Sequence, residues 1–189
     1  MKATGHFEQV RNVDPFAVLT EHTRRHIDAW AAKFPPDRKR SALIQALFGA
    51  QEQNHGYLTD ELITAVAKYL ELPAIWAYEV ASFYSMLETR PVGRNNVAIC
   101  TNISCWLNGA EDLLRHCETK LGIKAGESTP DGRIYLKLEE ECIAACVYAP
   151  AMTVNGHYHE RLTVEKIDAI LDGLSMDGPA HGHDAEGNH

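Results

Sequence analysis

The chain has 189 residues, of which 45% are hydrophobic, which is enough to bury one medium core or two small ones. Its formal net charge of -8 at pH 7 provides no basic face for phosphates, so nucleic acid is not an expected partner. The longest nearly apolar stretch, residues 74–87, contains Glu79 and is shorter than the roughly 20 residues that cross a bilayer. No direct membrane insertion is expected.

The cysteine content points to metal or redox chemistry. The amino-terminal residues form neither an apolar secretory segment nor an Arg-rich transit signal, so the chain is expected to stay in the cytoplasm. Five cysteines, an odd number, in a reducing compartment argue against a disulfide framework. Thiolates that bind a metal are the better interpretation.

Residues 1–94 contain no cysteine and are predicted to form a bundle of about four short helices. One helix is predicted to run from Asp14-Pro15 to the stop at Pro35-Pro36. Three more are predicted to begin at Asp37, at Thr59 and at Pro73. The side of the last helix that is expected to be buried carries Ile75, Trp76, Val80 and Phe83.

Residues 95–174 are predicted to form a compact α/β domain, for which a thioredoxin-like arrangement fits. The expected order is a buried strand at 97–99, a helix at 109–121, a half-buried strand at 133–139, a hairpin at 151–162 and a last helix from Thr163. In the half-buried strand, alternation places Ile134, Leu136 and Leu138 on the buried side. The hairpin is expected to turn at Asn155-Gly156. Residues 175–189 are predicted to be a disordered, histidine-containing tail.

Four of the five cysteines form two closely spaced pairs. Cys100 and Cys105 make a C-x4-C pair, and Cys142 and Cys146 make a C-x3-C pair after a long interval. Each pair is able to bind one metal atom, and a [2Fe-2S] cluster requires two protein sulfurs on each iron. The fifth, Cys117, falls on the apolar stripe of a predicted helix and is interpreted as a core residue.

Other interpretations of these cysteines remain open from spacing alone. Structural zinc also binds four cysteines, although its pairs are mostly C-x2-C with shorter intervals. Two disulfides, or four packing cysteines, are further alternatives. His22 and His26 lie four residues apart on a predicted helix without a third ligand nearby, and the tail histidines are as readily solvated as metal-binding.

The surroundings of the pairs bear on redox function. Small residues flank both pairs, which leaves room for backbone N–H groups to reach cluster sulfurs. Three acids, Glu139, Glu140 and Glu141, precede Cys142 and would lower a reduction potential, although a solvated acidic turn explains them equally well. No nucleotide, flavin or hydrolase motif occurs in the sequence, so a partner must supply the reaction.

The sequence resembles the small [2Fe-2S] subunit of NADH-quinone oxidoreductase, the E subunit of respiratory complex I, over roughly residues 20–174. In the helical half the resemblance lies in Ser41-Ala42-Leu43, Gln51-Glu52-Gln53, His55-Gly56-Tyr57-Leu58, Phe83-Tyr84-Ser85-Met86 and Pro91-Val92-Gly93. In the other half it lies in the C-x4-C pair, Leu121-Gly122-Ile123-Lys124, Gly126, Asp131-Gly132, Glu141-Cys142, Cys146 and Ala149-Pro150. The resemblance favours the cluster over zinc.

The resemblance implies a helical amino-terminal region followed by a thioredoxin-like [2Fe-2S] ferredoxin domain. It implies one cluster per chain, ligated by Cys100, Cys105, Cys142 and Cys146, that exchanges single electrons with FMN. FMN and NADH would be bound by a flavoprotein partner, docked by the helical region. The complex would lie on the cytoplasmic side of the inner membrane.

Two points qualify this family assignment. Related subunits also serve soluble NAD-reducing hydrogenases and NAD-dependent formate dehydrogenases, so the enzyme stays open, and a zinc-stapled adaptor is the alternative of another class. The second cysteine loop reads Cys-Ile-Ala-Ala-Cys, where the family usually has Leu-Gly in place of Ile143-Ala144. Since glycine permits a positive φ, the alanine bears on the conformation of this loop.

Overall fold

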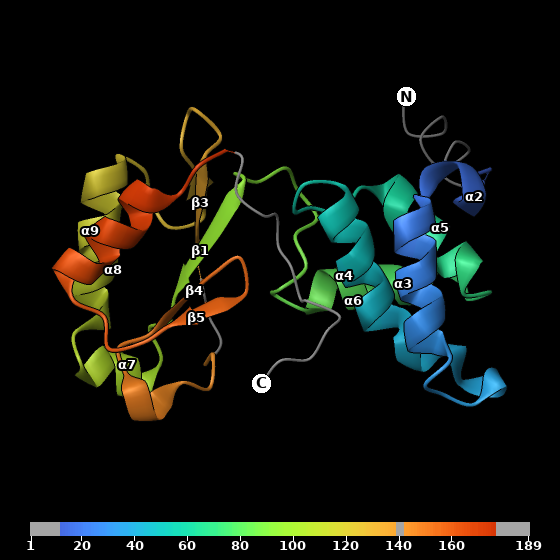
Figure 1. Cartoon of the computed structure of the whole chain (residues 1–189), viewed down its shortest axis with the longest axis horizontal. Coiled ribbons are helices and arrows are strands. Elements are labelled where there is room, and N and C mark those ends of the chain that lie inside the picture. The colour runs from blue at the N-terminus through green and yellow to red at the C-terminus, as the bar shows by residue number, and fades with distance from the viewer. Residues whose placement is uncertain (1–11, 139–141, 177–189) are drawn as a thin grey trace. The chain divides into compact units, whose positions relative to one another are not determined.

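The computed structural model describes residues 12–138 and 142–176, and it divides the chain into two compact units (Figure 1). The first unit ends at Pro91 and the second begins at Val92. The boundary expected from the sequence lay at residue 94. None of the helices in the described residues is both long and apolar enough to cross a membrane.

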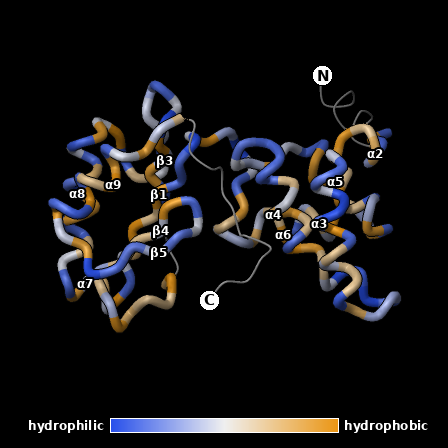
Figure 2. The backbone as a smooth tube through the Cα atoms, in the orientation of Figure 1, coloured by the Kyte–Doolittle hydropathy of each residue, from blue (hydrophilic) through white to orange (hydrophobic). Residues whose placement is uncertain are grey.

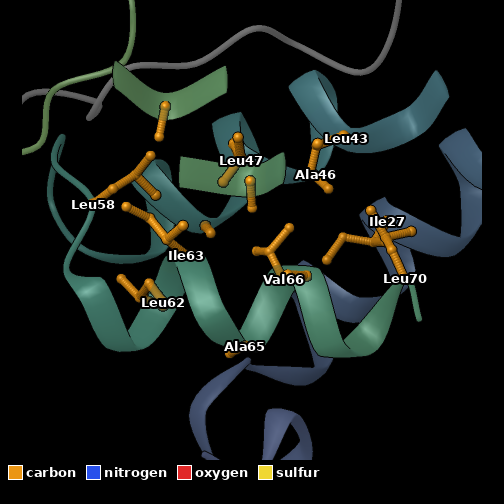
Figure 3. Close-up of a cluster of buried hydrophobic side chains, with 14 of the residues drawn as sticks. Ile27, Leu43, Ala46, Leu47, Leu58, Leu62, Ile63, Ala65, Val66 and Leu70 are labelled. Carbon is orange, nitrogen blue, oxygen red and sulfur yellow. The ribbon is translucent and has the colours of Figure 1, made fainter. Parts of the chain in front are cut away.

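The first unit is helical. Its elements are α2 (Pro15–Val18), α3 (Glu21–Ala31), the 3-10 helix η1 (Pro36–Ala42), α4 (Leu43–Gln53), α5 (Asp60–Tyr69) and α6 (Ala74–Phe83). Fully buried side chains of α3, α4 and α5, among them Ile27, Leu47 and Ile63, meet in one core (Figure 3). The predicted helical bundle is therefore present. The predicted helix start at Thr59 is confirmed, because Thr59 Oγ1 accepts a hydrogen bond from Leu62 N–H at the beginning of α5.

The prediction of one continuous helix from Asp14 to Phe34 is wrong. The chain leaves the helical conformation at Leu19 and Thr20, and Thr20 Oγ1 accepts a hydrogen bond from Thr23 N–H at 3.2 Å as the cap of α3. Gln53 of α4 fixes the break, because its side-chain oxygen accepts a hydrogen bond from Thr20 N–H at 2.9 Å. The break allows Leu19 to reach the core, where it is fully buried.

Two further expectations for the helical unit need correction. Asp37 does not cap the second helix, because α4 begins only at Leu43, after η1. In α6, which begins after Pro73 as predicted, the buried residues are Ala77 and Ala81. Ile75 and Phe83 are 61% and 77% exposed, whereas Val80 is half-buried against the core, so the predicted buried side is only partly correct.

The second unit contains a five-stranded sheet in the order β2-β3-β1-β4-β5. Its strands are β1 (Asn95–Ile99), β2 (Glu127–Ser128), β3 (Ile134–Lys137), β4 (Met152–Val154) and β5 (His157–His159). β1 runs parallel to β3, with Val97 opposite Leu136, and antiparallel to β4, with Ile99 opposite Met152. Hydrophobic residues recur within the strands of this sheet (Figure 2).

The helices of the second unit are α7 (Ile103–Leu107), α8 (Ala110–Leu121), the 3-10 helix η2 (Cys146–Tyr148) and α9 (Val164–Gly173). α8 and α9 lie side by side against one face of the sheet (Figure 1). Cys117 of α8 and Ile167 of α9 are fully buried in the core that the sheet side chains also join. Both helices and the hairpin turn at Asn155-Gly156 confirm the prediction.

Three details of this unit differ from the expectation. α7 and the two-residue strand β2 were not predicted, because both are too short to show a period. β3 ends at Lys137, and Leu138 is 55% exposed rather than buried, because the strand pairing stops before it. The predicted strand position at Glu139 and the tail from residue 177 lie outside the described residues.

Candidate metal centre

The sheet topology brings both predicted cysteine pairs to one end of the second unit. Since β1 and β3 are parallel, Ile99 and Lys137 lead out of the sheet at the same end. Cys100 follows β1 directly, and Cys142 lies in the connection that follows β3. Cys146 precedes β4, which enters the sheet at Met152 opposite Ile99. The two chain segments that carry the cysteine pairs, after β1 and between β3 and β4, therefore meet at this end, where α7 and η2 also lie (Figure 1).

Cys100 and Cys105 form the inner pair. Cys100 N–H donates to the carbonyl of Ala151 at 3.1 Å, which extends the β1–β4 pairing by one residue. Cys105 lies in α7 rather than in the loop that the sequence indicated. The helical turn, closed by a hydrogen bond from Trp106 N–H to the carbonyl of Asn102 at 2.8 Å, brings Cys105 back toward Cys100. Both side chains are almost fully buried.

Cys142 and Cys146 form the outer pair, and both are exposed. Their Sγ atoms are 3.3 Å apart. Ala144 N–H points to Cys142 Sγ at 3.4 Å, and Ala144 has a φ of 63°, in the left-handed region. A backbone donor on a cysteine sulfur is the interaction that the small residues of this loop predicted.

The thiols of the two pairs influence one another. Burial is the main cause that raises the pKa of Cys105 to about 11, and the neighbouring Cys100 raises it further. The hydrogen bond from Ala144 N–H, followed by contacts with Cys146 and Cys100, lowers the pKa of Cys142. The pKa of Cys146 is raised chiefly by its hydrogen bond with Cys142. Cys100 thus contributes to the pKa shifts of thiols in both pairs, so the two pairs lie near each other.

The donor set fits an iron–sulfur cluster. Two thiolates bound at about 2.3 Å to one tetrahedral metal atom lie about 3.7 Å apart, so the outer pair requires only a small opening from its 3.3 Å separation. Soft sulfur donors suit iron–sulfur clusters and zinc alike. Within residues 12–138 and 142–176, no three or more His, Cys, Asp or Glu side chains lie close enough together to hold a metal ion in the present arrangement.

The remaining candidates from the sequence lie away from this cluster. Cys117 is fully buried in α8, and burial raises its pKa to about 12, as expected for a core residue. His26 forms a hydrogen bond with the carbonyl of Gln45 at 3.2 Å, so a structural contact occupies its ring. The acids at 139–141 and the tail histidines lie outside the described residues.

An apolar surface next to the cysteines was not foreseen from the sequence. α7 and η2 contain no charged residue, and five of their large side chains are exposed. We call this set the apolar collar; it consists of Ile103, Trp106, Leu107, Val147 and Tyr148. The sequence feature that could have indicated this surface is the mostly apolar run from Ile103 to Leu107. Large apolar side chains are seldom exposed together unless a partner covers them.

Comparison with known proteins identifies related sequences. Residues 27–175 match the thioredoxin-like [2Fe-2S] ferredoxin family. The E subunit of NADH-quinone oxidoreductase from Rickettsia bellii is 48% identical over 145 residues, which cover 77% of this chain and 86% of that protein. E subunit 2 of NADH-quinone oxidoreductase from Rhizobium meliloti is 44% identical over 151 residues, which cover 80% of this chain and 88% of that protein.

Among solved structures, an NAD+-reducing [NiFe]-hydrogenase in the air-oxidised state is similar in fold. The TM-score is 0.56 at 24% identity, over 67% of this chain and 22% of the hydrogenase chain. This likeness concerns the fold alone, and the chain spans less than a quarter of the length of the hydrogenase chain that it matches.

Proposed function

This chain belongs to the thioredoxin-like [2Fe-2S] ferredoxin family and, within it, to the E subunits of NADH-quinone oxidoreductase, and from this premise we propose that it is the [2Fe-2S] electron-transfer subunit of such an enzyme. The proposed ligands are Cys100, Cys105, Cys142 and Cys146. The observation that supports the proposal is that the two chain segments carrying the cysteine pairs, the end of β1 and the β3–β4 connection, leave the sheet at the same end.

Each cysteine pair would hold one iron of the cluster. The bound cluster would supply one-electron chemistry, because a [2Fe-2S] cluster accepts and releases a single electron. Cys100 and Cys105 are buried, so this side excludes water, whereas the exposed Cys142 and Cys146 face the surface from which a partner approaches. Ala144 N–H would stabilise negative charge on Cys142 Sγ.

A flavoprotein is the proposed partner. The sequence carries no motif for a nucleotide or a flavin, so NADH and FMN are assigned to another protein of the complex. The apolar collar borders the proposed ligands Cys105 and Cys146, and a partner that covers it would come close to the cluster while shielding it from water. α6 exposes Ile75 and Phe83, which suits the expectation that the helical unit also docks.

The enzyme and its place in the cell are part of the proposal. The related sequences are E subunits of NADH-quinone oxidoreductase, which favours a quinone-linked complex over a soluble hydrogenase or a formate dehydrogenase. The similarity to the hydrogenase concerns the fold alone. A quinone-linked complex is bound to a membrane, so we place the chain at the cytoplasmic side of the inner membrane as a peripheral subunit. Co-purification of the tagged chain from membranes, with identification of the bound subunits, tests this assignment.

Substitution of the cysteines tests the ligand set. Changing any of Cys100, Cys105, Cys142 or Cys146 to Ser is expected to lower iron and acid-labile sulfide well below the two of each expected per chain, because oxygen is a poorer ligand than thiolate for these irons. The two contents are measured on protein purified without oxygen.

Cys117→Ala is the matched control. It removes a buried sulfur from the same unit, so it is expected to cost about 1 kcal/mol of stability and to leave the cluster at full content. A full cluster in Cys142→Ala protein would rule out the proposed ligand set. One zinc per chain, without sulfide, would support the structural adaptor instead.

A further inference from the structure

The second cysteine loop contains an alanine in a conformation that alanine rarely adopts. We propose, on the basis of the function above, that Ala144 is a positioning residue, whose left-handed backbone aims its N–H at Cys142 Sγ and whose Cβ limits the retention of the cluster. Ala144 is not itself a ligand of the iron. It acts through the sulfur of Cys142.

The geometry carries the first part of the inference. Ala144 N–H lies 3.4 Å from Cys142 Sγ, two residues back, so the bond closes a tight turn around the sulfur. The turn requires the φ of 63° at Ala144, whereas Ala145 has returned to a φ of -97°. The same turn leads into η2, which begins at Cys146 and places its Sγ 3.3 Å from that of Cys142.

The steric cost of alanine carries the second part. In the left-handed region Cβ of an L-residue crowds the following carbonyl oxygen, a crowding that glycine escapes. Ala144 is exposed, so its methyl group gains little packing that would offset the cost. The loop is also the accessible side of the cysteine cluster, because Cys142 and Cys146 are the exposed pair. Opening of this loop is therefore the expected route by which iron leaves.

Ala144→Gly is the first test variant. It keeps the N–H donor and removes the crowding, so the closed loop becomes more favourable relative to the open one. Iron release from the full-length protein is followed with a ferrous chelator in the presence of reductant. We expect the release to slow about fivefold, because a steric cost of about 1 kcal/mol at this position corresponds to about that factor. The reduction potential is expected to stay the same, because the hydrogen bond to Cys142 Sγ is retained.

Ala144→Val is the second test variant. A β-branched residue resists the left-handed region still more strongly, so the loop is expected to lose the N–H bond to Cys142 Sγ. Iron release should accelerate, and the reduction potential should fall, because a donor on sulfur stabilises the more negative reduced cluster. A purely structural role for Ala144 predicts no change of potential.

Ala145→Gly is the control for added chain freedom. It makes the same chemical change one residue later, where φ is -97° and no crowding is relieved, so slower iron release is not expected. Iron and sulfide content distinguishes failure of the proposed function from failure of the role of Ala144. Wild-type protein without sulfide would overturn the proposed function itself. Loaded protein whose release rate is the same in Ala144→Gly and wild type, with an unchanged potential in Ala144→Val, would overturn only the role of Ala144.

Discussion

Single residues next to the sheet set how closely its neighbouring segments approach. Gly93 is the clearest case, because a Cβ added there would lie 2.5 Å from the carbonyl carbon of Ile134 and 2.7 Å from the nitrogen of Tyr135. Both atoms belong to the backbone of β3, which cannot yield without moving the strand. Gly93 N–H also donates to Ser128 Oγ at 2.9 Å. A glycine is required here for close approach rather than for an unusual φ.

Gly93→Ala is accordingly expected to destabilise the second unit by about 2 kcal/mol, through the steric overlap with β3. Gly173→Ala is the matched control, because a Cβ at this last residue of α9 meets nothing within 4 Å. The control is expected to be neutral or to stabilise by up to about 1 kcal/mol. Urea unfolding followed by circular dichroism measures both, and equal midpoints for the two variants would contradict the close approach at Gly93.

Among the short elements, α7 combines two tasks in five residues. It presents Cys105 to the buried pair, and it exposes Ile103, Trp106 and Leu107 around the cysteines. Apolar side chains of this size on an uncharged helix favour a protein partner. α7 therefore links the proposed metal centre to the proposed docking surface.

The double substitution Ile103→Ser with Leu107→Ser tests this link. Both side chains are at least 70% exposed, so their loss is expected to leave the fold and the proposed cluster intact while weakening binding to the proposed flavoprotein partner at least tenfold. Binding is measured by co-purification and titration with the isolated partner. Phe83→Ser on α6, 77% exposed, tests the helical unit separately. Unchanged binding by the α7 variant would contradict a docking role for the apolar collar.

The elements also show which features a sequence reveals. Thr59 and Thr163 mark helix starts correctly, because each accepts a hydrogen bond from a backbone N–H three residues later. The buried face predicted for α6 was only partly correct, because the pattern gave weight to large side chains. Val80 packs on the core, but the residues that the helix buries fully are Ala77 and Ala81, where it packs on α4 and α5. α7 has five residues, too few to display a helical period.

The candidate site was predictable in its chemistry and less so in its geometry. Spacing singled out four cysteines as the proposed ligands, and the parallel pairing of β1 and β3 explains why segments far apart in sequence meet. The family pattern pointed to Ala144 as a departure, but its φ of 63° and its bond to Cys142 Sγ depend on the folded loop. The apolar collar depends on which face of α7 stays exposed, and only the tertiary structure determines that.

For the whole molecule, the described residues form two units, each with its own buried core. The core of the first unit draws on α3, α4 and α5, and the core of the second on the sheet, α8 and α9. The family match at residues 27–175 covers most of both units, so the helical unit belongs to the family as much as the cysteine-bearing unit does. The central claim is that this two-unit chain carries one electron on one [2Fe-2S] cluster.

Electron paramagnetic resonance on the full chain, purified without oxygen and examined before and after dithionite, tests that claim most directly. Iron, sulfide and zinc are assayed on the same sample. We expect a silent oxidised protein that gives about one S = 1/2 spin per chain on reduction, together with about two irons and about two sulfides. A protein that stays silent after reduction and holds one zinc per chain would contradict the claim.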